Sequence, residues 1–151
     1  MIDKPGLMEL ALAEAVAAGE RGEVPVGAVL VDGASGEVLA RGGNEVEARK
    51  DPTAHAEMLV IRAAAGATGL KRLEGADLYV TLEPCAMCAA AISFARLRRL
   101  YFGAGDPKGG AVEHGPRLFA QASCHHRPEV YGGIGERAAG ELLRAFFRAR
   151  R

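Results

Sequence analysis

The chain has 151 residues, of which 49% are hydrophobic and 25% are charged, and its formal net charge is zero. These values fit one globular domain, 1–151, with a full core. Three cysteines, an odd number, argue against a disulfide scaffold. The acidic N-terminal stretch lacks the pattern of a signal peptide, and no apolar run approaches the ~18 residues of a membrane span. We therefore expect a cytoplasmic protein with no membrane partner.

The charge is unevenly distributed along the chain. Residues 1–95 contain 8 basic and 14 acidic residues, a net charge of −6. Residues 96–151 contain 11 basic and 5 acidic residues, a net charge of +6. The basic half can form either an ordinary solvated surface or a site for a polyanion.

The first half of the chain predicts a helix followed by a hairpin. Residues 6–18 carry apolar side chains at helical spacing, as expected for an amphipathic helix. The apolar run 26–31 is typical of a buried strand, and the turn residues after it lead to a returning strand at 37–41. Residues 42–52 are predicted to be irregular.

A second long helix is expected at 53–65, with Asp51 as its N-cap and Pro52 as its first residue. The remaining predicted elements are a strand at 76–82, a helix of small residues from Pro84 to Ala95, a strand at 99–103, a glycine-rich loop at 105–116, a short strand at 129–131 and a final helix from Glu136. This order predicts an α/β fold, in which crossover connections place helices on both faces of the sheet.

Two short motifs carry the predicted chemistry: His55-Ala56-Glu57, and Pro84-Cys85-Ala86-Met87-Cys88. Cys85 and Cys88 are three residues apart at a predicted helix start, so their sulfurs can chelate one ion, and the helix N-terminus favours the thiolate. His55 lies near the start of the other helix. A catalytic zinc takes three such protein ligands and leaves one position for water.

Glu57 is two residues beyond His55 and cannot point in the same direction on a regular helix. We therefore predict that it moves protons rather than binding the metal. A carboxylate there can take a proton from a zinc-bound water and pass it to a leaving amine. The predicted reaction is attack of hydroxide on an amidine carbon, with loss of ammonia.

Other functions of the same residues remain open at this point. A lone C-x-x-C is more often a redox pair or half of a structural zinc site. A closed structural zinc needs a fourth ligand, which could come from one of four residues: His114, Cys124, His125 and His126. The combination with His55 and Glu57 favours a catalytic site.

The two motifs together resemble the signature of the cytidine deaminase-like zinc deaminases. The flanking blocks are most similar to bacterial tRNA adenosine deaminases, which make inosine at the wobble position. These blocks are residues 23–31, Asn44, 51–57, 78–85, 102–108, 126–127 and 146–148. The resemblance implies a three-layer α/β/α cytidine deaminase-like fold with a central mixed five-stranded sheet. It also implies one zinc ion per subunit and a homodimer. The alternative within this superfamily is a free-base or nucleoside deaminase acting on guanine or cytosine.

The resemblance also implies which residues bind the RNA, an anticodon stem-loop. Asn44 would hydrogen-bond the flipped base, Val24 would pack on it, and the backbone at Ala56 and Pro84 would contact its edge. The neighbouring nucleotides and phosphates would be held by Asp106, Lys108, His126 and Arg127. Phe147 would face the RNA or close the pocket. The residues themselves leave open whether Asn44 only caps a turn and whether Val24 and Phe147 are core residues.

The last predicted helix adds a basic stripe. Arg144, Arg148 and Arg151 are spaced to share one face beside two phenylalanines, a pairing typical of single-stranded RNA binding. The chain departs from many relatives at Gly43 and His125, where tryptophan and asparagine are frequent. A small-residue face, Ala86, Ala89, Ala90 and Ser93, would allow close packing either across a dimer interface or on the sheet.

Overall fold

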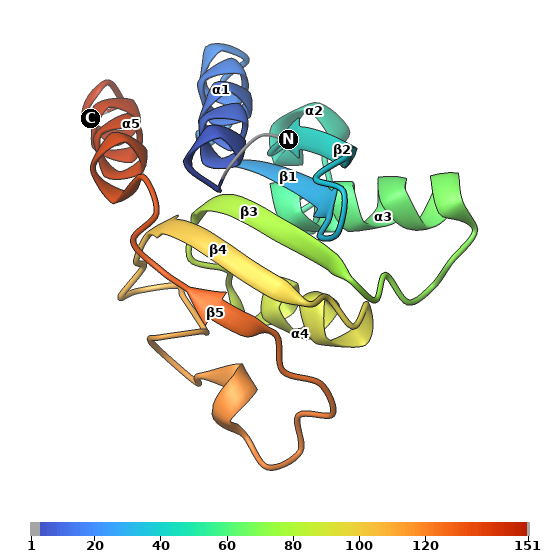
Figure 1. The fold of residues 1–151 in the computed structure, drawn as a ribbon. Coiled ribbons are helices and arrows are strands. Elements are labelled where there is room, and N and C mark those ends of the chain that lie inside the picture. The colour runs from blue at the N-terminus through green and yellow to red at the C-terminus, as the bar shows by residue number, and fades with distance from the viewer. Residues whose placement is uncertain (1–3, 151) are drawn as a thin grey trace.

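The computed structural model describes residues 4–150, which form one five-stranded sheet with helices on both faces (Figure 1). The strands are β1 (Gly27–Asp32), β2 (Val38–Gly43), β3 (Ala76–Leu82), β4 (Arg99–Ala104) and β5 (Glu129–Tyr131), and their order in the sheet is β2-β1-β3-β4-β5. β1 pairs antiparallel with β2 and β3, whereas β4 runs parallel to β3 and β5. The predicted mixed sheet of a three-layer α/β/α fold is confirmed.

Two helices cover each face of the sheet. The helices are α1 (Lys4–Glu20), α2 (Val46–Arg49), α3 (Ala56–Thr68), α4 (Ala86–Phe94) and α5 (Glu136–Arg148). Figure 1 shows α1 and α5 on one side of the strands and α3 and α4 on the other. In β3, Leu78 and Val80 pack in the core beneath α3 and α4, while Tyr79 between them faces α1. None of the helices within residues 4–150 is long and apolar enough to cross a membrane.

The contact between α1 and β1 depends on a glycine. A Cβ atom on Gly27 would lie 2.0 Å from the carbonyl oxygen of Ala11 and 2.5 Å from the amide nitrogen of Ala15. Only a residue without a side chain lets the helix backbone approach the strand this closely. The helix thereby seals Val29 and Val31 against solvent; they are 0% and 2% exposed.

Helices α3 and α4, at whose starts the two motifs lie, begin later than predicted. The prediction that Asp51 caps a helix is wrong, because its carboxylate accepts hydrogen bonds from the amide and hydroxyl of Thr53 and closes a local turn. α3 begins three residues later than predicted, at Ala56, with His55 as its N-cap. α4 begins at Ala86 with Cys85 as its N-cap, so the predicted start at Pro84 is also wrong.

Two short helical elements were not predicted. α2 interrupts the stretch expected to be irregular, and a 3₁₀ turn spans Leu118–Ala120. The strands predicted at 76–82 and 129–131 and the helix predicted from Glu136 begin where expected. The site lies where the N-termini of α3 and α4 meet, next to the carboxyl end of β3.

Candidate active site

The N-termini of α3 and α4 bring one imidazole and two thiols together. His55 and Cys85 are the N-caps of the two helices, and both have extended backbone conformations. The Nδ1 atom of His55 lies 3.6 Å from the sulfur of Cys85 and 3.6 Å from that of Cys88. The three ligand atoms all lie within 4.8 Å of one another. The sequence prediction that these residues converge is confirmed.

The electrostatics of this group suit a cation. A hydrogen bond with Cys88, together with His55, lowers the pKa of Cys85 to about 4, so this residue is a thiolate at neutral pH. The proton is retained by Cys88, whose pKa is raised by the Cys85 thiolate and by burial. A metal ion among the three atoms would replace that proton. One nitrogen and two sulfur donors are the set that zinc prefers, so the residues present fit one zinc ion.

Glu57 lies beside this group but is not part of it. Its side chain is in the first turn of α3, is 4% exposed and lines the same cavity as His55 and Cys85. Burial raises the pKa of Glu57 to about 7. A carboxyl group with a pKa near neutrality can both accept and donate a proton, as acid–base catalysis requires. The geometry therefore offers a proton carrier next to a metal-binding group.

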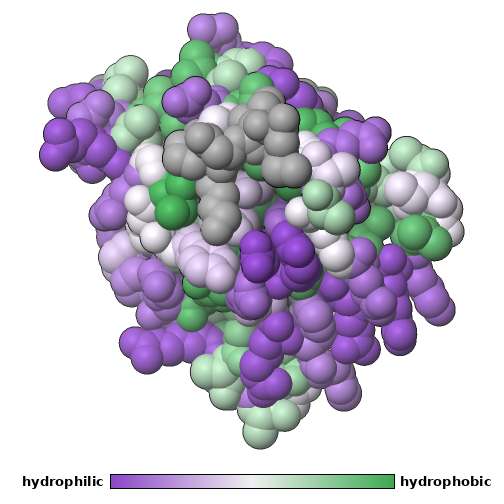
Figure 2. All heavy atoms as spheres, in the orientation of Figure 1, coloured by the Kyte–Doolittle hydropathy of each residue, from purple (hydrophilic) through white to green (hydrophobic). Residues whose placement is uncertain are grey.

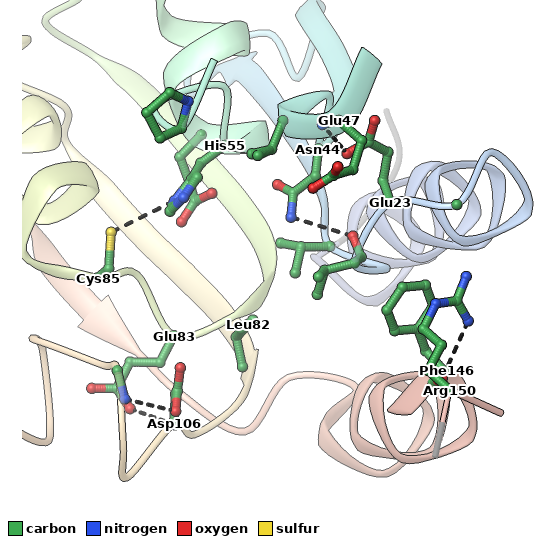
Figure 3. Close-up of a pocket in the computed structure, with 17 residues that line it drawn as sticks. Glu23, Asn44, Glu47, His55, Leu82, Glu83, Cys85, Asp106, Phe146 and Arg150 are labelled. Carbon is green, nitrogen blue, oxygen red and sulfur yellow. Dashed lines mark hydrogen bonds between the residues drawn. The ribbon is translucent and has the colours of Figure 1, made fainter. Parts of the chain in front are cut away.

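A cavity of about 720 Å³ opens over the candidate metal group. One wall contains Asn44 and Glu47, and Glu83 and Asp106 lie across from them (Figure 3). Phe146 and Arg150 reach it from α5, and the guanidinium of Arg150 stacks 3.4 Å above the ring of Phe146. The volume is in the range of small-molecule sites and can hold one nucleobase with part of its sugar.

Asn44 connects the end of β2 to the start of α3. Its Oδ1 atom accepts a hydrogen bond of 2.8 Å from the backbone amide of Ala56. Its Nδ2 atom donates to the carbonyl oxygen of Val24 at 3.2 Å. The residue does more than cap a local turn, because both partners are at least 12 positions away in the sequence. It keeps one N–H group of the amide available at the cavity wall.

Two buried glutamates that sequence reasoning missed hold the walls of the cavity. The carboxylate of Glu23 accepts the backbone amides of Glu47 and Ala48, both at 2.9 Å, and so fixes α2. The carboxylate of Glu83 accepts hydrogen bonds from the loop that contains Asp106. Both lie in blocks that carry the family resemblance, 23–31 and 78–85, but no role was assigned to either. The available signal was that each is an acidic residue next to an apolar strand.

The other residues predicted to contact the base lie at or behind the cavity wall. Val24 and Asn44 line it. Ala56 is fully buried behind Asn44, and Pro84 is also buried, with its carbonyl oxygen accepting the amide of Ala111. Val24 is half-buried and packs against the core cluster as well as lining the cavity.

Among the residues predicted to hold neighbouring nucleotides, Asp106 lines the cavity and the others lie outside it. Lys108 is exposed on the loop beyond Asp106. His126 is hydrogen-bonded through Nε2 to the carbonyl oxygen of Leu97, and Arg127 donates to the carbonyl oxygens of Phe119 and Gln121. Both side chains thus stabilise the segment between the 3₁₀ turn and β5.

The residues of α5 that reach the cavity differ from Phe147 and Arg148, which were predicted to contact the RNA. Phe146 and Arg150 line it, whereas Phe147 is 50% exposed and Arg148 is exposed to solvent. Hydrophilic side chains gather on the outer side of this helix in Figure 2. The third member of the predicted basic stripe, Arg151, lies outside the described residues.

Comparison with known proteins identifies the family of this chain. The model of the cytidine and deoxycytidylate deaminase zinc-binding region matches residues 1–104. A tRNA-specific adenosine deaminase of Agrobacterium fabrum is 62% identical over 151 residues, covering 100% of this chain and 98% of the relative. The chain belongs to the tRNA-specific adenosine deaminase family.

Two further members of the family support the assignment. A tRNA-specific adenosine deaminase of Bacillus subtilis is 50% identical over 141 residues, which cover 93% of this chain and 86% of that protein. A solved structure from work on A-to-I editing by tRNA:A34 deaminases superposes with a TM-score of 0.88 at 64% identity. It covers 91% of this chain and 98% of that one. The matched family model is a zinc-binding region, and the group of His55, Cys85 and Cys88 lies within it and can hold one zinc ion.

Proposed function

We propose that residues 1–151 form a single zinc-dependent deaminase domain that converts adenosine to inosine at the wobble position of tRNA. The observation that carries this proposal is the 62% identity, over the full chain, to a protein named as a tRNA-specific adenosine deaminase. The structure supports it with a zinc-binding group and a buried carboxyl group that share one cavity.

In this function, His55, Cys85 and Cys88 hold the metal. Zinc supplies Lewis acidity, which lowers the pKa of water enough for it to act as a nucleophile near pH 7. Hydrolysis forms a C–O bond at the amidine carbon of adenine and breaks the C–N bond to the exocyclic amine, which leaves as ammonia. The surrounding residues have to move protons and orient the base.

Glu57 carries the protons. It takes one from the attacking water and returns it to the departing amine, which requires a carboxyl group that changes protonation state near neutrality. The pKa of about 7 that burial confers on Glu57 meets this requirement. Because the side chain is 4% exposed, protons are exchanged with the substrate rather than with bulk solvent.

The base is oriented by the walls of the cavity. Asn44 offers its remaining N–H to a ring nitrogen, and Val24 and Leu82 supply apolar contacts. The guanidinium of Arg150 stacks on the ring of Phe146, and together they provide a planar surface on which a flanking base can stack. The backbone at Ala56 and Pro84 completes the contacts to the target base, and Asp106 contacts a neighbouring nucleotide.

The RNA on either side of the target meets the basic half of the chain. Lys108 and Arg148 are exposed and free to approach phosphates, and Phe147 presents a second aromatic ring beside them. His126 and Arg127 lie outside the cavity, near the start of β4, and would contact more distant parts of the RNA with the N–H groups that the loop does not use. The proposed substrate is an anticodon stem-loop, and the proposed location of the enzyme is the cytoplasm; the tRNA-specific relatives support both.

We also propose a homodimer formed through the outer face of α4. Phe94 at the end of this helix is 74% exposed, and Ala86 and Ala90 lie on the same side. Ala89 and Ser93, which were grouped with them from the sequence, are buried within the chain. A Phe94→Glu variant should sediment as a monomer. A dimer that survives this change would place the interface elsewhere.

One experiment tests the reaction and its substrate together. The zinc-loaded enzyme is incubated with an anticodon stem-loop that has adenosine at the wobble position and, separately, with free adenine, guanine and cytosine, and the products are separated by mass. We expect inosine in the RNA and no reaction of the free bases. Glu57→Gln should keep zinc but form no inosine. Reaction of guanine or cytosine alone would support the alternative deaminase activity and contradict the tRNA assignment.

A further inference from the structure

A single buried carboxylate organises the loop that forms one side of the cavity. Glu83 follows β3 directly and is 2% exposed. Its Oε1 atom accepts the amide of Asp106 at 2.9 Å and the imidazole Nδ1–H of His114 at 2.6 Å. Its Oε2 atom accepts the amides of Val112, Glu113 and His114 at 2.8 to 3.0 Å.

These bonds link two parts of the site. Glu83 is two positions before the metal ligand Cys85, and the amides belong to a loop 23 to 31 residues further along the chain. The backbone adds to the connection, because the amide of Ala111 donates to the carbonyl oxygen of Pro84. The loop in turn carries Asp106 and Gly109, which line the cavity (Figure 3).

The loop is closely shaped to this carboxylate. A Cβ atom on Gly110 would lie 2.5 Å from the Cδ of Glu83 and 2.6 Å from the carbonyl oxygen of Asp106. The chain therefore passes Glu83 at a distance that only glycine allows. Backbone N–H groups that converge in this way form a nest for negative charge, and here the charge is part of the chain.

Glu83 cannot serve as a second proton carrier. A carboxylate has about four lone-pair positions, and five N–H groups of the loop occupy them. Glu57, by contrast, lies beside the zinc group with a pKa near neutrality. The contacts of Glu83 thus serve the shape of the loop rather than the transfer of protons.

We propose that Glu83 is a positioning residue that holds the 105–114 loop in the conformation that presents Asp106 and Lys108 to the RNA. The proposal rests on the proposed function for the identity of the substrate. Glu83 contributes to substrate binding and not to the chemical step, because it fixes the surface to which the substrate binds. Its loss should weaken substrate binding while leaving the zinc group and Glu57 in place.

The test compares three variants on the same anticodon stem-loop. Glu83→Gln keeps the size of the side chain but turns an NH₂ group toward N–H donors, and we expect KM to rise at least tenfold with kcat within about threefold. His114→Ala removes one of the five donors from a half-buried side chain and should raise KM by a smaller factor. Glu113→Gln removes a charge from an exposed side chain of the same loop and should change neither constant.

A second readout does not depend on activity. In hydrogen exchange, the amides of Asp106, Val112, Glu113 and His114 should exchange faster in Glu83→Gln than in the unaltered protein, with zinc content still one per chain. Unchanged exchange at these amides would overturn the proposal, as would a fall in kcat with constant KM. If the unaltered enzyme makes no inosine, the proposed function fails, and the exchange measurement still decides the role of Glu83.

Discussion

Replacing Asn44 with alanine removes one buried and one partly buried hydrogen bond. The amide of Ala56, which is fully buried, loses its acceptor, and the carbonyl oxygen of Val24 loses its donor. A buried N–H left without a partner costs about 1–3 kcal/mol, and an ordinary hydrogen bond contributes about 1 kcal/mol. We therefore expect Asn44→Ala to lower the free energy of unfolding by about 2–4 kcal/mol.

Urea unfolding of the zinc-loaded protein measures this loss. The matched control is Thr81→Val, which removes the acceptor of the buried amide of Gly27 outside the cavity. It should cost about 1–3 kcal/mol, by the same reasoning, without changing the KM for RNA. Asn44→Ala should lose both stability and activity. If Asn44→Ala unfolds at the same urea concentration as the unaltered protein, the connection that we assign to Asn44 does not hold α3 in place.

Three further predictions concern packing, the metal and the RNA. Gly27→Ala should cost about 3 kcal/mol or more, because α1 would have to move off β1, whereas Gly42→Ala, which meets nothing within 4 Å, should be nearly neutral in thermal unfolding. Cys88→Ser should abolish zinc binding measured by metal analysis; retention of one zinc per chain would exclude Cys88 as a ligand. Arg148→Glu should weaken RNA binding and reduce its salt dependence, and an unchanged slope would make this arginine an ordinary surface residue.

The sequence was sufficient to predict the sheet and the convergence of the zinc group. β3 and β5 were predicted to the residue, because each is a short apolar or β-branched run between turn residues. His55, Glu57 and the two cysteines could be assigned because their chemistry depends on residue type and on local spacing. That information is contained within a few positions of the chain.

The walls of the cavity could not be predicted in the same way. Glu23 and Glu83 bind backbone amides 23 to 31 positions away, and backbone amides leave no mark in a sequence. The starts of α3 and α4 were misplaced because Asp51 and Pro84 suit a helix start as well as a turn. Phe146 rather than Phe147 reaches the cavity because of the orientation in which α5 packs against β4, where Gly103 approaches Ala139. This orientation is set by tertiary packing and not by the local sequence.

The position of two zinc ligands at helix N-caps gives the metal a second role. His55 and Cys85 are 30 residues apart, so an ion bound to both closes a loop that contains all of α3 and β3. By the chain-entropy relation for a covalent cross-link, closing a loop of this length removes about 4 kcal/mol of conformational entropy from the unfolded chain. Zinc bound here would act as a reversible cross-link, and a chelator would release this central fifth of the chain to proteases as well as stop the reaction.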